Sequence, residues 1–336
     1  MAGGEVSAHE LGRGGSGFEK GKHVRRSYAR QLSVMEWLVD VPEDLHTNWY
    51  VMPRPEGPRC LLISEGGSTE SRLKDGSFHK RFQSPLPGGS KGCQGGKRAS
   101  KCVLDAVFHA PTNTFFVTDC MIWDSYDMHE CDFEFRRFWL VQKMAELRQC
   151  QSQCGDTYAT HNLDVVPAEM ASIHSMERAY REDVGYVKDG FVFVHKESHY
   201  RQGQTPLCLQ WKDANTSRYP IDTDAHGNVL EKQPVVLQLS DDSQSVRTGD
   251  EPPITLGRMP QHFADTNAKQ LKPGMLFRFN IGENCLHFGS DGQPVGADLE
   301  LVGVSRKRLE PDIVSKIIFK YLFRMQHITF QMLLKQ

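Results

Sequence analysis

The sequence lacks the long apolar runs that membrane insertion requires. No stretch of the 336 residues approaches the roughly 20 apolar residues that span a bilayer, and the N-terminal stretch MAGGEVSAHELGRGG contains no apolar core of a secretory signal. We therefore expect neither a membrane partner nor secretion. The composition is otherwise that of a globular chain, with 39% hydrophobic and 24% charged residues. A length of roughly 150 residues per domain predicts two domains.

The sequence also lacks a disulfide framework and a metal-binding pattern. An odd number of cysteines, several of them in apolar stretches, is typical of reduced and buried thiols. The cysteines in apolar stretches are Cys60, Cys102, Cys120, Cys208 and Cys285. Cys150 and Cys154 are the one close pair, and no second Cys or His pair at zinc spacing follows them, although a structural zinc ion needs four spaced ligands. We expect no metal and no cofactor.

A lysine is missing from the position where nucleotide transfer would need it. The stretch PRPEGPRCLLI, Pro53 to Ile63, resembles the Lys-x-Asp-Gly-x-Arg motif of enzymes that attach a nucleotide to their own lysine. Arg54 occupies the lysine position and Glu56 the aspartate position, while Gly57 and Arg59 are kept. A guanidinium group stays protonated in proteins and cannot act as the nucleophile. We therefore expect no catalytic residue here.

Positive charge is concentrated in one part of the chain. The formal net charge of -2 predicts no global attraction to nucleic acid. Between residues 72 and 101, however, the sequence carries eight basic residues and a single acidic one, Asp75. The basic residues are Arg72, Lys74, Lys80, Arg81, Lys91, Lys97, Arg98 and Lys101. Such a patch favours a phosphate-bearing partner, and a solvated loop face is the alternative interpretation.

Hydrophobic periodicity predicts a strand-rich α+β body. From residue 48 onward, short runs of β-branched and aromatic residues alternate with Pro, Gly and Asn turns, which predicts an antiparallel sheet. A helix is expected over 131–149, and a second from Pro167 to about Arg181. The residues expected near one face of the first helix are Phe135, Phe138, Trp139, Val141, Met144 and Leu147. Strands are expected again at 190–196 and 206–211.

The C-terminal part predicts a smaller β unit that ends in a helix. A strand at 234–239 precedes a Gly-, Pro- and Asp-rich linker over 240–273, and residues 274–292 predict a hairpin followed by a strand at 298–304. Residues 310–325 predict an amphipathic helix. Its expected core residues are Ile313, Ile317, Ile318, Tyr321 and Leu322. We divide the chain into a disordered tail at 1–30, a body at 31–238, and a linker with the β unit at 239–336.

Longer stretches resemble two related families. DGFVF at 189–193 and LQWKD at 209–213 are similar to later nucleotidyltransferase motifs, and LQWKD is close to the Leu-Lys-Trp-Lys-Pro of messenger-RNA guanylyltransferases. Five further stretches are SVMEWLVDVPEDL, GSTESRLKDGSFHKRFQSPLPGG, FFVTDCMIW, DGFVFVHKESHY and TPLCLQW. Together they resemble the cap-binding domain of the snurportin family, and the resemblance runs from about Tyr28 to Trp211.

The resemblance implies a fold and a function. The fold is an antiparallel-sheet nucleotidyltransferase domain, related to messenger-RNA guanylyltransferase, followed by a degenerate OB-like β-barrel domain with C-terminal helices. The function is non-catalytic binding of the 2,2,7-trimethylguanosine cap of spliceosomal small nuclear RNA. It also implies an adaptor role in the nuclear import of the ribonucleoprotein, and therefore shuttling between cytoplasm and nucleus.

The resemblance further implies a set of cap-binding residues. Trp211 matches the tryptophan that stacks on the base, and Trp37 matches the one beside the N2 methyl groups. Val34 and Met35 line the start of the same pocket, where family members often carry Leu-Ser. The residues that match those on the cap phosphates are Arg59 and Lys74.

Each of these residues also has an ordinary structural interpretation. Trp37 could anchor the core, and Trp211 shares a predicted strand face with Leu207 and Leu209, which favours burial. Arg59 could form a salt bridge at the start of a strand, and Lys74 opens a Lys-Asp-Gly turn.

Two departures from the family limit what the resemblance implies. In place of a long importin-β-binding segment the chain has EKGKHVRRSYAR, from which we expect only an electrostatic interaction. Its basic residues are Lys20, Lys22, Arg25, Arg26 and Arg30. The C-terminal extension at 306–310 does not reproduce the Arg-x-Asp-Lys motif of the guanylyltransferase OB-fold.

The alternative hypotheses are an active messenger-RNA guanylyltransferase, a binder of 7-methylguanosine caps, and a structural scaffold.

Overall fold

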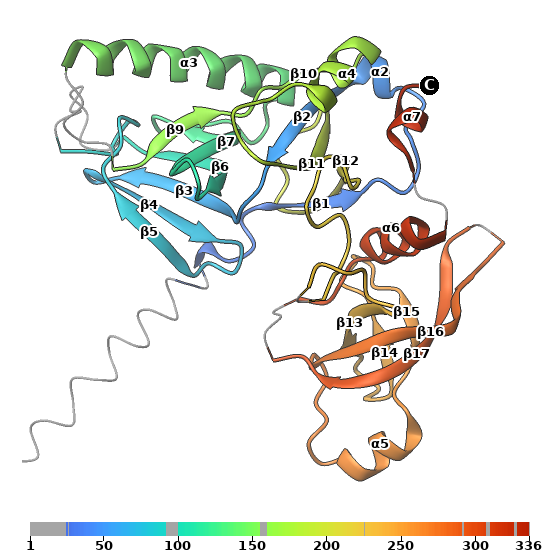
Figure 1. The fold of residues 1–336 in the computed structure, drawn as a ribbon. Helices are drawn as coiled ribbons and strands as arrows, with labels where there is room; N and C mark the ends of the chain where they lie inside the picture. The colour runs from blue at the N-terminus through green and yellow to red at the C-terminus, as the bar shows by residue number, and fades with distance from the viewer. Residues whose placement is uncertain are drawn as a thin grey trace, which may run out of the picture. The chain divides into compact units, whose positions relative to one another are not determined.

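The computed structural model describes residue 25 and residues 27–91, 100–154, 160–224, 226–290, 292–306, 310–325 and 328–335, with only the backbone at 150–154, 283 and 284. The chain forms two compact units, each built from several segments (Figure 1). Unit 1 comprises Met1–Ser33, Gly57–Val165 and His199–Gly203, and unit 2 comprises Val34–Glu56, Val166–Ser198 and Gln204–Gln336. The prediction of an α+β protein built on antiparallel sheets is confirmed.

Unit 1 is built on one sheet. Its strands are β3 (Arg59–Glu65), β4 (Ser68–Leu73), β5 (Phe78–Phe82), β6 (Cys102–His109), β7 (Thr114–Trp123), β8 (Tyr126–Asp127) and β9 (Asn162–Val165). Six of them follow the order β5-β4-β3-β6-β7-β8 in antiparallel pairs, and β9 pairs parallel to β7. Gly66 and Gly67 both have positive φ in the β3–β4 turn, as a tight hairpin turn with this twist requires.

One long helix, α3 (Phe133–Cys154), covers the sheet of unit 1 (Figure 1). The predicted helix is confirmed, and Asp132 caps its start by accepting the backbone N–H of Phe135 at 2.7 Å. The predicted buried face is partly wrong. The residues that pack on the sheet are Leu140, Met144 and, in part, Trp139 and Leu147, whereas Phe135, Phe138 and Val141 are exposed.

The first sheet of unit 2 carries four of the predicted cap residues, Val34, Met35, Trp37 and Trp211. It orders β1 (Ser33–Trp37), β12 (Gly203–Trp211), β11 (Lys188–His195), β2 (Trp49–Pro55) and β10 (Glu169–Met170). Two helices, α2 (Leu45–Asn48) and α4 (Ile173–Arg181), belong to the same unit. The second helix was predicted to start at Pro167, but it starts at Ile173, because Ser172 caps it and Glu169–Met170 pairs with β2.

The second sheet of unit 2 corrects the prediction for the C-terminal part. It orders β15 (Thr255–Arg258), β14 (Ser245–Arg247), β13 (Gln233–Leu239), β16 (Leu276–Phe288) and β17 (Pro294–Val304). The expected linker at 240–273 holds β14, β15 and helix α5 (Gln261–Asn267) instead. The expected hairpin at 274–292 is a single strand, β16, that pairs with β17. The boundary drawn after residue 238 falls within β13.

Helix α6 (Val314–Met325) joins the two sheets of unit 2. Ile317 packs in the core of the second sheet and Phe319 in the core of the first. The predicted helix is confirmed, and Ile317 is buried as predicted, whereas Ile318 and Tyr321 are only half-buried. A short helix, α7 (Phe330–Leu333), adds Phe330 to the core of the first sheet. The cores of the two sheets of unit 2 are therefore linked through the C-terminal segment.

The prediction of reduced, buried cysteines is confirmed in part. None of the six cysteines whose side chains are described forms a disulfide, and Cys60, Cys102 and Cys120 are buried, whereas Cys208 and Cys285 are only half-buried. Burial raises the pKa of the Cys102 thiol to about 11, so this thiol stays protonated. The described residues contain no group of three or more His, Cys, Asp or Glu side chains that could hold a metal ion. None of the helices among them has the length and apolar character needed to cross a membrane.

Candidate functional site

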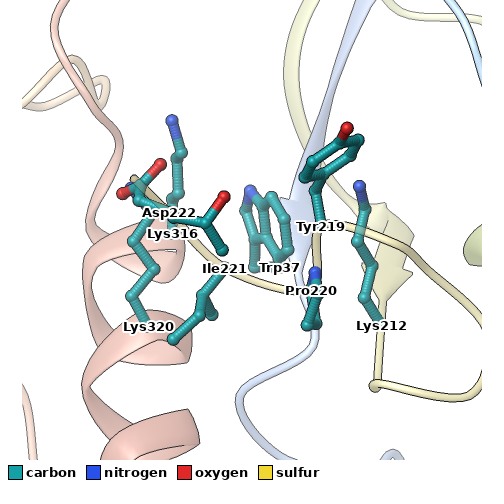
Figure 2. A pocket seen from close by; sticks show the side chains of 9 residues that line it. Trp37, Lys212, Tyr219, Pro220, Ile221, Asp222, Lys316 and Lys320 are labelled. Atoms are coloured by element: carbon teal, nitrogen blue, oxygen red, sulfur yellow. The ribbon is translucent and has the colours of Figure 1, made fainter. Parts of the chain in front are cut away.

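A pocket of about 340 Å³ lies in unit 2, beside the end of β1 (Figure 2). It takes its lining from β1, from the segment that follows β12, and from α6. The lining residues are Trp37, Lys212, Tyr219, Pro220, Ile221, Asp222, Thr223, Lys316 and Lys320. The aromatic rings can stack on a planar group of a ligand, and the cations can pair with negative charge on another part of the same ligand.

Trp37 supplies the central aromatic surface of the pocket. Its backbone N–H donates to the Ser315 hydroxyl at 3.1 Å, and its ring lies 4.6 Å from that of Phe319 at 43°. Figure 2 shows the indole in the middle of the lining, with Tyr219 on one side and Ile221 on the other. One side of the ring is thus held by α6, while the half-buried indole still borders the pocket.

The loop 219–223 forms another wall of the pocket. Ile221 is buried in the core of the first sheet, which holds the loop against the unit. The Ser217 hydroxyl accepts the backbone N–H of Tyr219 at 3.1 Å, while the Tyr219 side chain is 59% exposed. A large aromatic ring that borders a pocket and is open to solvent can take up a planar ligand with little rearrangement.

Three lysines reach the pocket, and each pairs with an aspartate. Lys316 donates to Asp312 at 2.8 Å, Lys320 pairs with Asp222 and Lys212 with Asp189. Lys316 and Lys320 are four residues apart and therefore share one face of α6. Burial, and next the charge of Lys316, lowers the pKa of Lys320. The pKa of Lys212 is lowered mainly by burial as well.

The three nucleotidyltransferase-like stretches meet beside this pocket. Arg54 from the first stretch and Lys212 from the third both pair with Asp189 from the second, and the Ser217 hydroxyl donates to the same carboxylate at 2.7 Å. The nearby Lys188 is also engaged, because its ammonium group donates to three backbone carbonyls at the end of α4, at 2.8 to 2.9 Å. Arg54, Lys212 and Ser217 thus meet at one carboxylate, that of Asp189.

Trp211, the predicted stacking residue, lies inside the core of unit 2. Its side chain is 0% exposed, its ring is 5.8 Å from Phe191, and its indole N–H donates to the carbonyl of Ile328 at 2.8 Å. Phe330 of α7 lies 6.4 Å from the same ring and stacks on Tyr180 at 3.9 Å. The C-terminal segment therefore covers the indole in this structure, and stacking of a cap on it stays a prediction.

Val34 and Met35 lie half-buried in β1, ahead of Trp37. The pocket takes its β1 residue from the end of the strand, at Trp37. A direct role of Val34 and Met35 in base recognition stays a prediction.

Arg59, predicted to bind phosphate, lies in unit 1 in a closed set of hydrogen bonds. Its guanidinium donates twice to Asp105, at 2.9 and 2.5 Å, and once each to the carbonyl and hydroxyl oxygens of Ser33, both at 2.7 Å. Asp105 is 1% exposed and also accepts the Tyr200 hydroxyl at 2.9 Å. This geometry is that of a structural salt bridge at the start of β3, and the phosphate role of Arg59 stays a prediction.

Lys74, the other predicted phosphate residue, lies exposed in unit 1 after β4. It opens a turn in which Gly76 has a φ of 76° and Asp75 accepts the backbone N–H of Ser77 at 2.9 Å. The predicted cap residues are thus divided between the units: Trp37, Trp211, Val34 and Met35 in unit 2, and Arg59 and Lys74 in unit 1. That one ligand contacts all of them stays a prediction.

The basic patch between residues 72 and 101 is partly neutralised within unit 1. Arg72 and Arg81 both pair with Glu70, and Lys101 pairs with Glu65 at 3.3 Å. Lys97 and Arg98 lie outside the described residues. This pattern favours the interpretation of a solvated face.

Some predicted terminal features lie outside the part of the chain that the structure describes. They are Lys20, Lys22 and Arg26 of the N-terminal basic segment and Lys307, Arg308 and Leu309 of the altered C-terminal motif. Arg25 of the basic segment pairs with Asp75 in unit 1.

Tyr219, Lys316 and Lys320 were not predicted as site residues. The signal for the two lysines was present in the sequence, because they stand four residues apart in the amphipathic segment SKIIFKY. Helical periodicity was used there to predict core residues, and it does not tell which neighbour the polar face will meet. Tyr219 offered no pattern, since it stands in a turn-rich stretch.

Several solved structures of DNA ligases have a weak overall likeness to the chain. A mycobacterial DNA ligase D complexed with ATP and MES matches at 12% identity and a TM-score of 0.37, over 83% of this chain and 96% of that one. Chlorella virus DNA ligase-adenylate matches at 11% identity and a TM-score of 0.35, over 82% and 98% of the two chains. A likeness at this level establishes neither an activity nor a ligand for this protein.

A family model gives a specific match. Residues 31–212 match the model described as Snurportin1, m3G cap-binding domain, and this segment is more than half of the 336-residue chain. The matched segment contains Trp37, Arg59, Lys74 and Trp211, and it ends at Lys212, within the pocket lining. On this match, the chain belongs to the Snurportin1 m3G cap-binding domain family.

Proposed function

We propose that this protein binds the 2,2,7-trimethylguanosine cap of small nuclear RNA and does not catalyse a reaction on it. Membership of the cap-binding family supports cap binding at the level of the family. The observation that carries the proposal for this chain is Trp37, whose indole borders a pocket that also contains the exposed ring of Tyr219. A guanine methylated at N7 is a positively charged ring, for which an indole face offers stacking and cation–π attraction.

We place the base against Trp37 and Tyr219. Trp211 is covered by Ile328 and Phe330, so a base could reach it only after the C-terminal segment had moved. The pocket at Trp37 needs no such movement. The N2 methyl groups would add apolar contact with the indole, which an unmethylated guanine lacks.

The proposed absence of catalysis rests on Arg54. The guanidinium group cannot lose its proton to attack a phosphate, and it is held by Asp189. The meeting of Arg54, Asp189 and Lys212 supports a nucleotidyltransferase-like origin for the fold, with the nucleophile replaced.

The C-terminal sheet of unit 2 would be a degenerate OB-like domain. Its two edge strands, β15 and β17, lie close together. This is seen at Gly257 of β15, where an added Cβ atom would lie 2.7 Å from the Leu299 side chain of β17. Such an approach of the edge strands of a five-stranded sheet supports a barrel-like closure.

We further propose an adaptor role in nuclear import, with the capped ribonucleoprotein as cargo and a protein that shuttles between cytoplasm and nucleus. The basic residues at 20–30 would contribute an electrostatic contact to importin-β. Pull-down of importin-β by the full chain, compared with a chain in which these basic residues are replaced by glutamine, tests this contact. Equal capture by both chains would reject it.

Competition between cap analogues tests the proposed ligand. A labelled trimethylguanosine cap analogue is displaced from the protein by unlabelled trimethylated, 7-methylated and unmethylated analogues, and we expect the trimethylated analogue to compete best. Better competition by the 7-methylated analogue would reassign the protein to ordinary caps. Equal competition by the unmethylated analogue would contradict the proposed ligand.

The variant Trp37→Ala tests the proposed position of the base. We expect it to weaken cap binding on the order of ten- to a hundredfold, the effect of losing one stacked ring. Trp139→Ala is the matched control, since Trp139 is a half-buried indole in unit 1 and should leave affinity unchanged. Unchanged affinity in Trp37→Ala would remove that ring from the site.

A further inference from the structure

The pocket at Trp37 carries more positive charge than stacking on a base would need. Two of its cations, Lys316 and Lys320, come from α6, which lies beyond the segment matched by the family model. The third, Lys212, is the last residue of that segment. Figure 2 shows Lys316 and Lys320 on one side of the Trp37 indole and Lys212 on the other.

We propose that Lys212, Lys316 and Lys320 form a polyphosphate-binding site that holds the 5′–5′ triphosphate bridge of the capped RNA. The site deepens the proposed function and rests on it for the identity of the ligand. It assigns phosphate binding to unit 2, in the same pocket as the base, and makes the C-terminal helix α6 a part of the cap site.

Donor capacity supports this assignment. A lysine ammonium group has three donors, and each of the three lysines pairs with one aspartate. Two of the aspartates are also held by other groups. Asp312 accepts the backbone N–H of Val236 at 2.9 Å, and Asp189 accepts the Ser217 hydroxyl at 2.7 Å. A phosphate can therefore bind the lysines without displacing their carboxylate partners.

The balance of charges around the pocket also supports phosphate binding by the three lysines. Asp189 is shared by Arg54 and Lys212, and Asp222 acts on both Lys320 and Arg324. Each of these two carboxylates thus faces two cations. Glu56, which acts on Lys212, has a cation of its own, because Arg218 approaches it to 3.9 Å. A polyanion would supply the negative charge that the carboxylates do not.

Burial makes the excess of positive charge around the pocket unfavourable in the unliganded protein. Lys212 and Lys320 have mostly buried side chains, and the pKa of each is lowered mainly by that burial. Asp189 raises the pKa of Lys212 in part and Arg54 lowers it, whereas Lys316 lowers the pKa of Lys320 and its aspartate neighbours raise it in part. A bound polyphosphate would favour the charged form of both lysines, and this coupling makes its binding favourable.

Glutamine variants of the two α6 lysines, read out by calorimetry, test the site. The probes are inorganic tripolyphosphate, a trimethylguanosine cap analogue with its triphosphate bridge, and the trimethylguanosine nucleoside. We expect Lys316→Gln and Lys320→Gln each to weaken tripolyphosphate and cap binding on the order of tenfold, and to leave nucleoside binding unchanged. Lys232→Gln removes an equal charge from an ion pair with Glu300 in the second sheet and should change none of the three affinities.

The outcomes separate this inference from the proposed function. If the cap binds equally well to the wild type and both variants, the polyphosphate site is wrong and cap binding stands. If tripolyphosphate binds through the lysines but no cap analogue binds better than it, the site is supported and the proposed cap function is wrong. If neither probe binds, both are wrong. Thermal melting identifies a glutamine variant that fails to fold. Lys316→Arg, which keeps the positive charge, then serves in its place, and the proposal requires that it retain tripolyphosphate binding.

Discussion

The two units use cations in opposite ways. In unit 1, Arg59 makes four hydrogen bonds to Asp105 and Ser33, and this cluster also takes up the Tyr200 hydroxyl. In unit 2, lysines pair singly with aspartates around a pocket. Both regions contain buried or half-buried ion pairs. In unit 1, most of the donors of the Arg59 guanidinium bind groups of the protein. In unit 2, the lysines line a pocket that a ligand can enter.

This difference matters because ligand binding depends on available donors rather than on charge alone. A guanidinium already held by two protein partners must lose hydrogen bonds before it can bind a phosphate. An ammonium group with one partner can add another. The same contrast applies to the two tryptophans of unit 2, since Trp211 is covered by Phe330 while Trp37 borders the pocket.

The largest expected effect concerns Trp211. Replacing this fully buried indole with alanine should lower the free energy of unfolding by about 3–5 kcal/mol, because it leaves a large cavity in the core. Urea denaturation followed by circular dichroism measures the loss, and Trp211→Phe, which refills part of the cavity, is the matched variant. A stable Trp211→Ala protein with weakened cap binding would instead show that the cap reaches this ring.

A comparable effect is expected at the closed cluster of unit 1. Asp105→Ala leaves the Arg59 guanidinium without its carboxylate partner, and removing one member of a buried pair costs about 3–5 kcal/mol. The control is Asp164→Ala, which breaks the exposed pair with Arg148 and should cost less than about 1 kcal/mol. Equal losses in the two variants would contradict the distinction between closed and open ion pairs.

At the pocket we expect a smaller effect, and it is a gain in ligand affinity rather than a loss of stability. Asp222→Asn removes the negative charge beside Lys320, so tripolyphosphate should bind several-fold more tightly, as loss of a like charge near the anion predicts. Calorimetry at two salt concentrations should show the gain shrinking as salt screens the charges. Weaker binding in Asp222→Asn would mean that the carboxylate holds Lys320 in the position that binding needs.

The last prediction is that no covalent transfer of GMP to the protein takes place. Incubation of the protein with labelled GTP and magnesium should yield no covalent protein–GMP band, because Arg54 cannot act as the nucleophile. A band would support the guanylyltransferase hypothesis. Its loss in Lys212→Gln would then identify Lys212 as the attacking residue.

Local patterns predicted many elements correctly and failed where long-range contacts decide. The periodicity of 310–325 gave α6, because one apolar face of a helix is visible in a short window. The strands β14 and β15 were missed, since they are short, Gly- and Pro-flanked, and become strands by pairing with β13 and with each other. The predicted face of α3 included Phe138, which is exposed, because helical spacing alone does not show where the sheet lies.

The sequence by itself determined that the chain builds antiparallel sheets, that position 54 carries no nucleophile, and which family the segment 31–212 matches. Those properties depend on residue identity and on short-range spacing. Only the tertiary structure decided that Arg59 is engaged, that Trp211 is covered, and that Tyr219 and the lysines of α6 gather around Trp37. Strand alternation tells which side a residue faces, but what lies on that side depends on segments distant in the chain.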